Sequence, residues 1–289
     1  MWSRGLLFSG TLLYSSLSIA DMCEASVLSL EPITSVNTYD VFATSTYPLR
    51  QQFNVRTAIS EGCDVIVVLD LENERAALTN AHRAEMRFDW YSTQGQIQSN
   101  KWILQLDSDN TDAIVEFRFV GGQWLEAGVY KNRLRASLFQ ANSSMEMDQL
   151  TLNVDAAVLP SARIQFYGLS QRHYNLDLGS LKSNKIIDYD PRLWVESTAP
   201  YALSVDSLYD GKLRHQSQNP KWDLAYQMLI ANEAISFDGT QRRWSRSHST
   251  DGTPLSIQII VGDTKRKAGG KYSDTVHIYI APSLSLAPQ

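Results

Sequence analysis

The sequence predicts an all-β protein made of two β-sandwich domains in tandem. Its 289 residues exceed the roughly 150 of a usual domain and can build two separate cores. Short β-branched and aromatic runs, several of them alternating with polar residues, recur between polar turns, which is the pattern of strands in sandwiches. A motif that returns 142 positions later indicates that the second domain is a copy of the first.

The composition argues against several classes of protein. A hydrophobic content of 43% and a charged content of 20% are typical of a globular chain, and the net charge of -5 offers no basic footprint for nucleic acid. Two cysteines cannot form a multi-cysteine zinc site. Because the chain also has no Gly-x-Ser-x-Gly or His-Glu-x-x-His motif, we expect no nucleic-acid partner, no metal, no cofactor and no enzymatic activity.

The first twenty residues predict an export signal. Arg4 provides a positive start, residues 5–13 form an apolar run, and Ser18-Ile19-Ala20 is a small-x-small cleavage site. A membrane anchor is the alternative, but serines at 15, 16 and 18 interrupt the run before the ~20 residues that a spanning helix needs. We therefore expect residues 1–20 to be a signal peptide, removed after Ala20.

Export places Cys23 and Cys63 in an oxidising compartment, where we expect them to form a disulfide. In the chain-entropy model, closing a ring of roughly 40 residues is worth about 4 kcal/mol. A catalytic cysteine is the alternative, but no motif marks the partner histidine that it would need.

Predicted strands follow one another along the mature chain without a competing amphipathic helix. Residues 72–84, rich in alanine, are the one helix-leaning stretch, and we expect a loop with a helical turn there. The strands are predicted at residues 24–30, 63–69, 85–90, 102–106, 114–119, 133–138, 149–154, 163–166, 192–195, 201–205, 256–260 and 275–280.

The repeat is carried by a glycine turn, a tyrosine, two polar residues and an alternating strand. This order occurs at residues 126–134 and again at 267–276, with Tyr130 and Tyr272 in matching positions. Leu78 ahead of residues 86–90 likewise resembles Leu213 ahead of 224–228. Chance similarity between strands is the alternative explanation. We expect an N-terminal domain of residues 21–155 and a C-terminal domain of residues 156–289.

These residues resemble the spore coat U-type pilin domain of archaic chaperone–usher pili. The resemblance rests on a cysteine in the first strand, a second cysteine at the head of the next apolar strand, and the closing strand at residues 270–276. Residues 194–205 followed by 210–215 are similar to the family's central strand pair. The second copy departs by having no cysteines, and the first has Asn132-Arg133-Leu134 in place of Asp-Thr-Val.

The resemblance implies immunoglobulin-like sandwiches, the C-terminal one lacking its last strand. A periplasmic chaperone, and later a neighbouring pilus subunit delivered by an outer-membrane usher, would fill the open groove by β-augmentation. Two prolines after Ile280 disfavour a central closing strand in that copy. Residues 149–154 either close the first domain or open the second. The expected groove edge consists of Tyr272, Thr275, Val276, Ile278 and Ile280.

The position of Cys23, third after the predicted cleavage, leaves no donor segment ahead of the first strand. A subunit that receives a strand but gives none ends a fibre. We therefore expect a tip adhesin, exported through the periplasm to the pilus tip on the surface of a Gram-negative bacterium, where it mediates attachment or biofilm formation through an unknown surface or host receptor. The candidate contact residues are Trp90, Tyr91, Trp102 and Trp124, although a residue of each kind is more often part of a sandwich core.

Two alternatives stay open at this point. The first is a free-standing secreted or surface structural protein of spore-coat type that needs no usher. The second is an exported carbohydrate-active enzyme on a β-sandwich, for which Glu85 and Asp89, or Asp107 and Asp109, would have to meet in a cleft.

Overall fold

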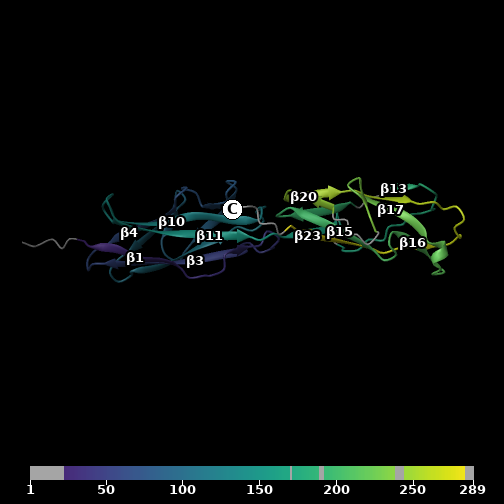
Figure 1. The fold of residues 1–289 in the computed structure, drawn as a ribbon. Coiled ribbons are helices and arrows are strands. Elements are labelled where there is room, and N and C mark those ends of the chain that lie inside the picture. The colour runs from purple at the N-terminus through teal and green to yellow at the C-terminus, as the bar shows by residue number, and fades with distance from the viewer. Residues whose placement is uncertain (1–22, 170, 189–191, 238–243, 284–289) are drawn as a thin grey trace, which may run out of the picture.

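The computed structural model describes residues 23–169, 171–188, 192–237 and 244–283, and they form two β-sandwich domains arranged end to end (Figure 1). Apart from a short 3-10 turn at Pro220–Trp222, the regular elements are strands, so the predicted all-β class is confirmed. The predicted signal peptide, residues 1–20, lies outside the described residues. In the part of the chain that is described, no helix is long and apolar enough to cross a membrane.

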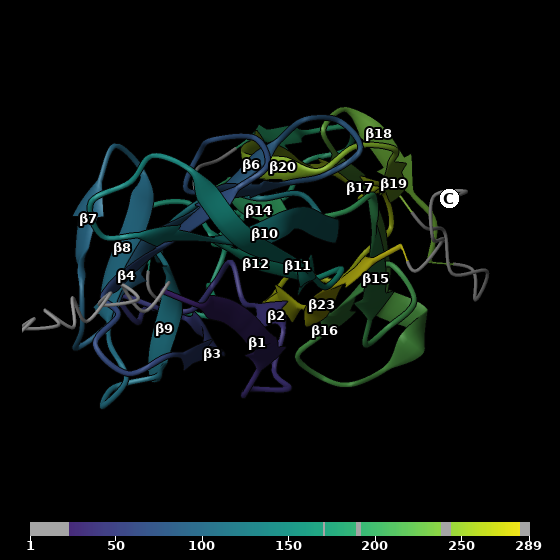
Figure 2. The same ribbon diagram turned by 90° about the vertical axis from the view of Figure 1, so that its left-hand side faces the viewer.

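The first domain is built from strands β1 to β11. They follow the sheet order β1-β3-β9-β6-β5-β10-β4-β8-β7, and β11 pairs with both β10 and β2. Figure 2 looks along the molecule from this domain, with β1 and β3 on one side of the core and β10 and β11 on the other. The strands are β1 Ala25–Pro32, β2 Thr38–Tyr39, β3 Leu49–Ile59, β4 Val65–Leu71, β5 Ala77–Thr79, β6 Glu85–Tyr91, β7 Gln96–Gln98, β8 Lys101–Leu106, β9 Asp112–Phe119, β10 Gly128–Gln140 and β11 Glu146–Val158.

Strand β11 closes the first domain, which answers the question that the sequence left open. It pairs antiparallel with β10 from Gly128↔Val158 to Phe139↔Glu146, and parallel with β2 at Ala157↔Thr38. Its alternate residues Val154, Ala156 and Val158 are buried in the first core. The predicted domain boundary after residue 155 therefore falls inside β11.

The second domain contains strands β12 to β23 in smaller sheets. Their orders are β12-β14-β20, β13-β21-β17-β16-β22 with β18 on β17, and β19-β15-β23. Among the described strands, β23 is thus the edge of its sheet, paired with β15 on one side. The strands are β12 Ala162–Phe166, β13 Ile186–Asp188, β14 Leu193–Ser197, β15 Tyr201–Ser207, β16 Lys212–His215, β17 Leu224–Ile230, β18 Glu233–Ile235, β19 Trp244–Arg246, β20 Thr250–Leu255, β21 Ile257–Val261, β22 Tyr272–Ser273 and β23 Val276–Pro282.

The two cores differ in completeness. The second core has fewer than half as many fully buried apolar residues as the first, and many of its apolar side chains stay partly exposed. In β10, Leu134, Ala136 and Leu138 are all buried, whereas Val276, Ile278 and Ile280 of β23 are only partly buried. Burial of apolar surface contributes ~25 cal/mol per Å², and side chains that stay partly exposed to water contribute only part of this free energy. By this measure the second domain is the less stable of the two.

The predicted strand set was incomplete: besides several short strands, it missed the longer strands β3, β17 and β20. The 11-residue β3 was missed because the polar Gln51 and Thr57 occupy inward positions that alternation assigns to apolar residues. The helical turn expected within residues 72–84 is wrong, because Ala77–Thr79 instead form β5 between two turns and pair with β6. Pairing with a neighbouring strand outweighs the weak helix preference of the alanines here.

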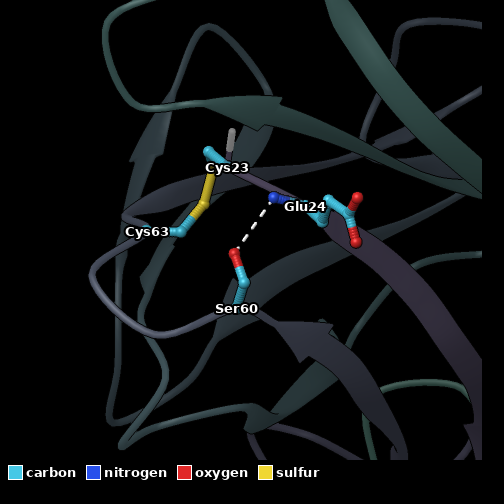
Figure 3. The surroundings of a disulfide bond; sticks show 4 residues. All are labelled: Cys23, Glu24, Ser60 and Cys63. Carbon is cyan, nitrogen blue, oxygen red and sulfur yellow. Dashed lines mark hydrogen bonds between the residues drawn. A yellow bond between two sulfur atoms is a disulfide. The ribbon is translucent and has the colours of Figure 1, made fainter. Parts of the chain in front are cut away.

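The predicted disulfide between Cys23 and Cys63 is confirmed. It joins Cys23, two residues before β1, to the turn ahead of β4, and the Glu24 backbone N–H donates to Ser60 Oγ at 3.0 Å beside it (Figure 3). Cys63 is buried against the first core. The bond therefore ties the first strand of the domain to its centre.

Replacing Cys23 and Cys63 together with serine should lower the free energy of unfolding of the first domain by about 2–4 kcal/mol. The second domain has its own core, so its unfolding transition should stay in place. Calorimetry of the oxidised protein and the double variant measures both transitions. Equal loss in both would contradict two independent cores.

Candidate functional site: an open groove in the second domain

A groove of about 930 Å³ runs between the sheets of the second domain. Its floor is apolar and comes from β16, β17 and β21. One rim is β22 with the start of β23, and the other is the segment 174–181 that follows β12. The floor residues are Leu213, Leu224, Tyr226, Met228, Ile257 and Ile259.

The first rim contains most of the groove-edge residues predicted from the sequence. Tyr272, Val276 and Ile278 line the groove. Thr275, the residue before β23, does not line it, because its side chain is exposed to solvent. Ile280 packs against the second core beyond the lining residues.

The second rim is held in place without being a strand. Lys185 Nζ donates to the carbonyl oxygens of Leu178 and Ser180 at 2.8 and 3.0 Å, and the Tyr174 ring lies 5.7 Å from that of Phe166. Leu176 in this rim is 36% exposed. Sequence reasoning missed this rim, although the alternation of Tyr174, Leu176 and Leu178 with polar residues was an available signal.

In the first domain, a strand occupies the position that corresponds to this groove. There, β11 lies between β10 and β2, and its inward residues complete the core. In the second domain, β23 corresponds to β10, and the groove separates it from the segment 174–181, with no described strand between them. The groove is thus the position of a missing closing strand.

Matching hydrogen bonds show that the two edges are equivalent. Tyr130 Oη donates to the carbonyl of Glu126 at 3.1 Å, and Tyr272 Oη donates to that of Ala268 at 2.6 Å, in each case four residues back. This is the tyrosine corner of immunoglobulin-like sandwiches. Burial, followed by the nearby Glu126 charge, raises the pKa of Tyr130 to about 12. Tyr272 differs in being only half-buried, since its ring borders the open groove.

Asp274 of the Tyr-Ser-Asp-Thr-Val motif fastens this rim to the rest of the domain. Its Oδ2 accepts from Tyr226 Oη at 2.7 Å and from Ser207 Oγ at 2.6 Å, and its Oδ1 accepts from the Thr275 backbone N–H at 2.7 Å. Burial, together with the Asp274 carboxylate, raises the pKa of Tyr226 well above its usual value. Asn132 accepts in the same way from the N–H of Arg133 in the first domain.

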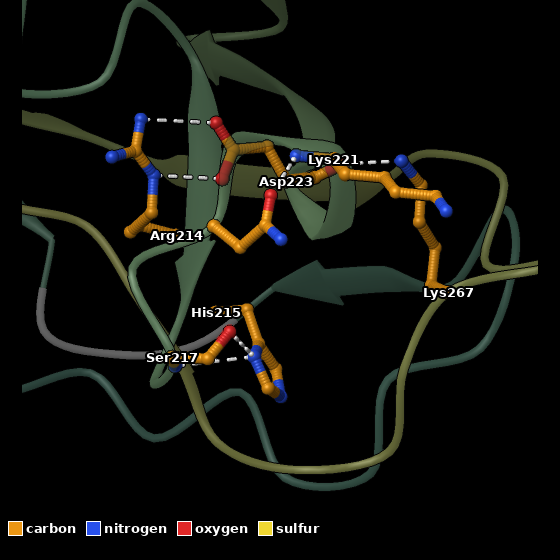
Figure 4. A network of polar contacts seen from close by, with 7 residues as sticks. Arg214, His215, Ser217, Lys221, Asp223 and Lys267 are labelled. Atoms are coloured by element: carbon orange, nitrogen blue, oxygen red, sulfur yellow. Dashed lines mark hydrogen bonds and ion pairs between the residues drawn. The ribbon is translucent and has the colours of Figure 1, made fainter.

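A polar network supports the groove at the end of the second domain that lies farthest from the first domain (Figure 4). Arg214 makes a bidentate ion pair with Asp223, at 2.7 and 3.1 Å, and Lys267 Nζ donates to the Asp223 carbonyl at 2.5 Å. His215 Nδ1 lies 2.7 Å from Ser217 Oγ, and its ring packs edge-on against Tyr272. This network holds the 262–271 loop, and with it the first rim, against β16.

The predicted contact aromatics are not gathered on one surface. Trp90 and Trp102 are each 7% exposed, and their indole N–H groups donate to the carbonyls of Asn100 and Gln94. These two residues are core residues, so their assignment to a contact surface is wrong. Tyr91 is 40% exposed, with the Arg118 guanidinium 3.2 Å from its ring centroid.

Trp124 lies at the junction between the domains. Its ring is 6.1 Å from that of Phe42, which in turn lies 4.7 Å from the guanidinium of Arg163 in the second domain. The Ala127 N–H also donates to the Thr198 carbonyl at 2.7 Å across this junction. Trp124 is therefore placed at the end of the first domain that faces the second, away from a distal contact surface.

The carboxylate pairs of the enzyme alternative have structural partners. Glu85 forms an ion pair with Arg75, Asp89 accepts from Tyr47, and Asp107 accepts from the backbone N–H groups of Asp109 and Asn110. Neither pair lines the groove or the smaller cleft of about 420 Å³ on β4, β8 and β10. Among the described residues, no cluster of His, Cys, Asp and Glu is arranged to hold a metal ion.

That smaller cleft surrounds a buried carboxylate. Asp70 accepts a bidentate pair of hydrogen bonds from Arg135 at 3.0 and 2.8 Å, and Lys101 Nζ lies 3.1 Å from it. Burial alone would raise the pKa of Asp70, but the bonds from Arg135 and Lys101 outweigh it and lower the pKa. The cluster is satisfied internally, which favours a structural role.

The fold and the groove define a class: a two-domain β-sandwich protein whose first domain is closed by its own last strand and whose second domain has an empty strand position. No family model matches the sequence, and a search of curated proteins found no match. The resemblance to the spore coat U-type domain therefore stays a prediction.

Solved structures with partial similarity are pilus proteins. The chain is similar to one chain of the CsuC–CsuE chaperone–tip adhesion subunit complex of Acinetobacter baumannii, at 14% identity and a TM-score of 0.43, covering 79% of this chain and 90% of that one. It is also similar to the CupB6 tip adhesin of Pseudomonas aeruginosa, at 10% identity and a TM-score of 0.38, covering 91% and 95%. The CfaE adhesin of enterotoxigenic Escherichia coli gives 11% identity and a TM-score of 0.36, covering 91% and 82%.

Proposed function

We propose that this chain is the tip adhesin of a chaperone–usher pilus and that its second domain receives a β-strand from another protein. The observation that supports this most directly is the empty strand position between β23 and the segment 174–181, since the first domain fills the same position with β11. An edge strand beside an apolar groove is the arrangement used in β-augmentation, where backbone hydrogen bonds provide affinity and alternate side chains provide register.

The occupants follow from the chemistry of the groove. An extended segment with apolar residues at every second position would place those side chains on Leu213, Met228 and Ile259 and its backbone along β23. A periplasmic chaperone is proposed to supply such a strand during export, and the adjacent pilus subunit to supply it in the fibre, with delivery through the outer-membrane usher. The disulfide is compatible with passage through the periplasm.

The difference between the two domains suggests their division of labour. A closed first domain needs no partner strand, so it is free to face outward and contact a surface or receptor. The open second domain faces the shaft. In this proposal the protein forms the end of the fibre, exposed at the cell surface, where it would mediate attachment and biofilm formation.

Hydrogen exchange and thermal unfolding of the exported chain, without any donor, test the open groove. We expect the amides of β23 to exchange much faster than those of β10, because unpaired edge groups are exposed to water. We also expect the second domain to unfold first. A peptide of residues 149–158, which has the alternation of a closing strand, should raise that transition and protect β23.

The free-standing structural protein is the competing function, and the same experiment separates the two. If β23 is as protected as β10, and the chain unfolds in one transition that the peptide does not move, then no strand is missing and the tip adhesin proposal fails.

A further inference from the structure

The end of the second domain farthest from the first domain is basic, although the whole chain has a net charge of -5. The loop 262–271 and the turn 182–185 lie together there: the Thr264 N–H donates to Ser183 Oγ at 2.9 Å, and the Asn184 N–H to the Val261 carbonyl at 2.9 Å. Figure 1 shows β13, β16 and β17 at this end of the molecule. We call it the basic end; its cations include Lys182, Lys221, Lys265, Arg266, Lys267 and Lys271.

These charges are free for a partner to use. Lys182, Lys265, Arg266 and Lys271 are exposed, and across the described part of the chain none of them forms a salt bridge. Lys267 donates to the Asp223 carbonyl, and it too forms no salt bridge with a described residue. Asp263 lies among them, where the backbone N–H of Lys265 and the neighbouring positive charges lower its pKa.

The basic end is also the mouth of the groove. Lys267 and Lys271 line it beside Tyr272, at the start of the first rim. In the first domain, the corresponding Tyr130 pairs with Ala156, near the C-terminal end of β11, which runs antiparallel to β10. A donor strand bound as β11 is would therefore leave the groove at the basic end with its C-terminal side.

The opposite end of the molecule, in the first domain, is acidic. The turns that join β3 to β4 and β10 to β11 meet near the start of β1, as the bonds from the N–H of Ser60 to the Glu24 carbonyl and of Ala141 to the Asp64 carbonyl show. The turn that joins β8 to β9 lies by the end of β3, where the Thr57 N–H donates to the Thr111 carbonyl. The acidic residues at these turns include Glu61, Asp107, Asp109 and Glu146. Separated charge of this kind orients an approaching charged partner before contact.

Resting on the proposed function, we infer that the basic end docks an acidic surface of the donor protein, located directly after the C-terminal end of its donor strand. The strand would provide the apolar contacts of the groove, and the acidic surface would meet Lys265, Arg266 and Lys271. Charge complementarity at the rim mainly speeds association and selects among partners, so the right donor is chosen at the mouth before its strand is seated.

Two peptides test this inference: residues 149–158 followed by three glutamates, and the same segment followed by three glutamines. At about 0.01 M ionic strength, where screening extends over about 30 Å, the Glu peptide should bind the full chain about tenfold more tightly than the Gln peptide. At about 1 M the difference should vanish. The K265Q/R266Q variant should lose the preference and keep the binding of the Gln peptide.

The matched control is K131Q/R83Q in the first domain, which removes the same charges; Arg83 has a φ of 65° and Arg266 one of 61°. It should keep the preference. Equal binding of both peptides at low salt, or a preference that survives K265Q/R266Q, would overturn the inference and leave the proposed function standing. A preference only when the glutamates precede the segment would overturn the assigned direction. Failure of the Gln peptide to bind at all would instead contradict the proposed function.

Discussion

Val154→Asp should convert the first domain from a closed sandwich into an open one. Val154 is 4% exposed in the centre of β11, so the substitution places an unpaired carboxylate in the first core. Because a buried charge without a partner is among the most destabilising changes known, we expect the first domain to lose about 3–5 kcal/mol of unfolding free energy. Denaturant unfolding followed by the tryptophans of that domain measures the loss.

The informative part of this experiment is rescue. If β11 acts as a closing strand in the way that an external donor would, a peptide of residues 147–158 added in trans should restore much of the lost stability. Asn153→Asp is the matched control, since it adds the same side chain to the exposed face of the same strand and should change little. A stable Val154→Asp domain, or one that the peptide leaves unchanged, would contradict the role assigned to β11.

Local patterns predicted the parts of the fold that local physics decides. The tyrosine motif at Tyr130 and Tyr272 was recognisable because a tyrosine corner needs only a few neighbouring residues, and both hydroxyls make the same bond four residues back. The disulfide followed from export and from having two cysteines. Strands with clear alternation, such as β6 and β9, were also found at nearly the right residues.

What failed depended on distant partners. Gln51 is buried in β3 because its Nε2 donates to the carbonyl of Asp155, 104 residues away. The local sequence pattern does not predict this bond. Whether Trp90 is a core or a surface residue is likewise decided by Phe88 and Phe117, which surround its ring. The second rim of the groove has no regular pairing, so its role emerged only from its position opposite β23.

The role of residues 149–154 likewise depends on a distant partner that the local sequence does not predict. Their alternation predicts a strand but says nothing about which sheet it joins. The answer comes from the length of β11, which keeps its pairing with β10 up to Val158 and leaves only a short connection to β12 at Ala162. The asymmetry between the domains, on which the proposed function depends, is therefore a property of the assembled sheets.

Ile278→Asp should abolish strand binding by the second domain. Ile278 lines the groove from β23 and is only partly buried while the groove is empty, so the variant's carboxylate can stay hydrated until a strand covers it. Seating a strand would then bury an unpaired charge. We expect the affinity for the 149–158 peptide to fall at least about 100-fold. Titration calorimetry on the full chain measures the change.

The neighbouring residue provides the control, because β23 alternates and His277 points to solvent. His277→Asp adds the same carboxylate to the same strand and should bind the peptide as the unmodified chain does. Unfolding of each variant without peptide separates loss of binding from loss of folding: the two should have similar second transitions, and only His277→Asp should be stabilised by the peptide. If the Ile278→Asp chain still binds, the strand does not lie in the groove, and the proposed mode of assembly is wrong.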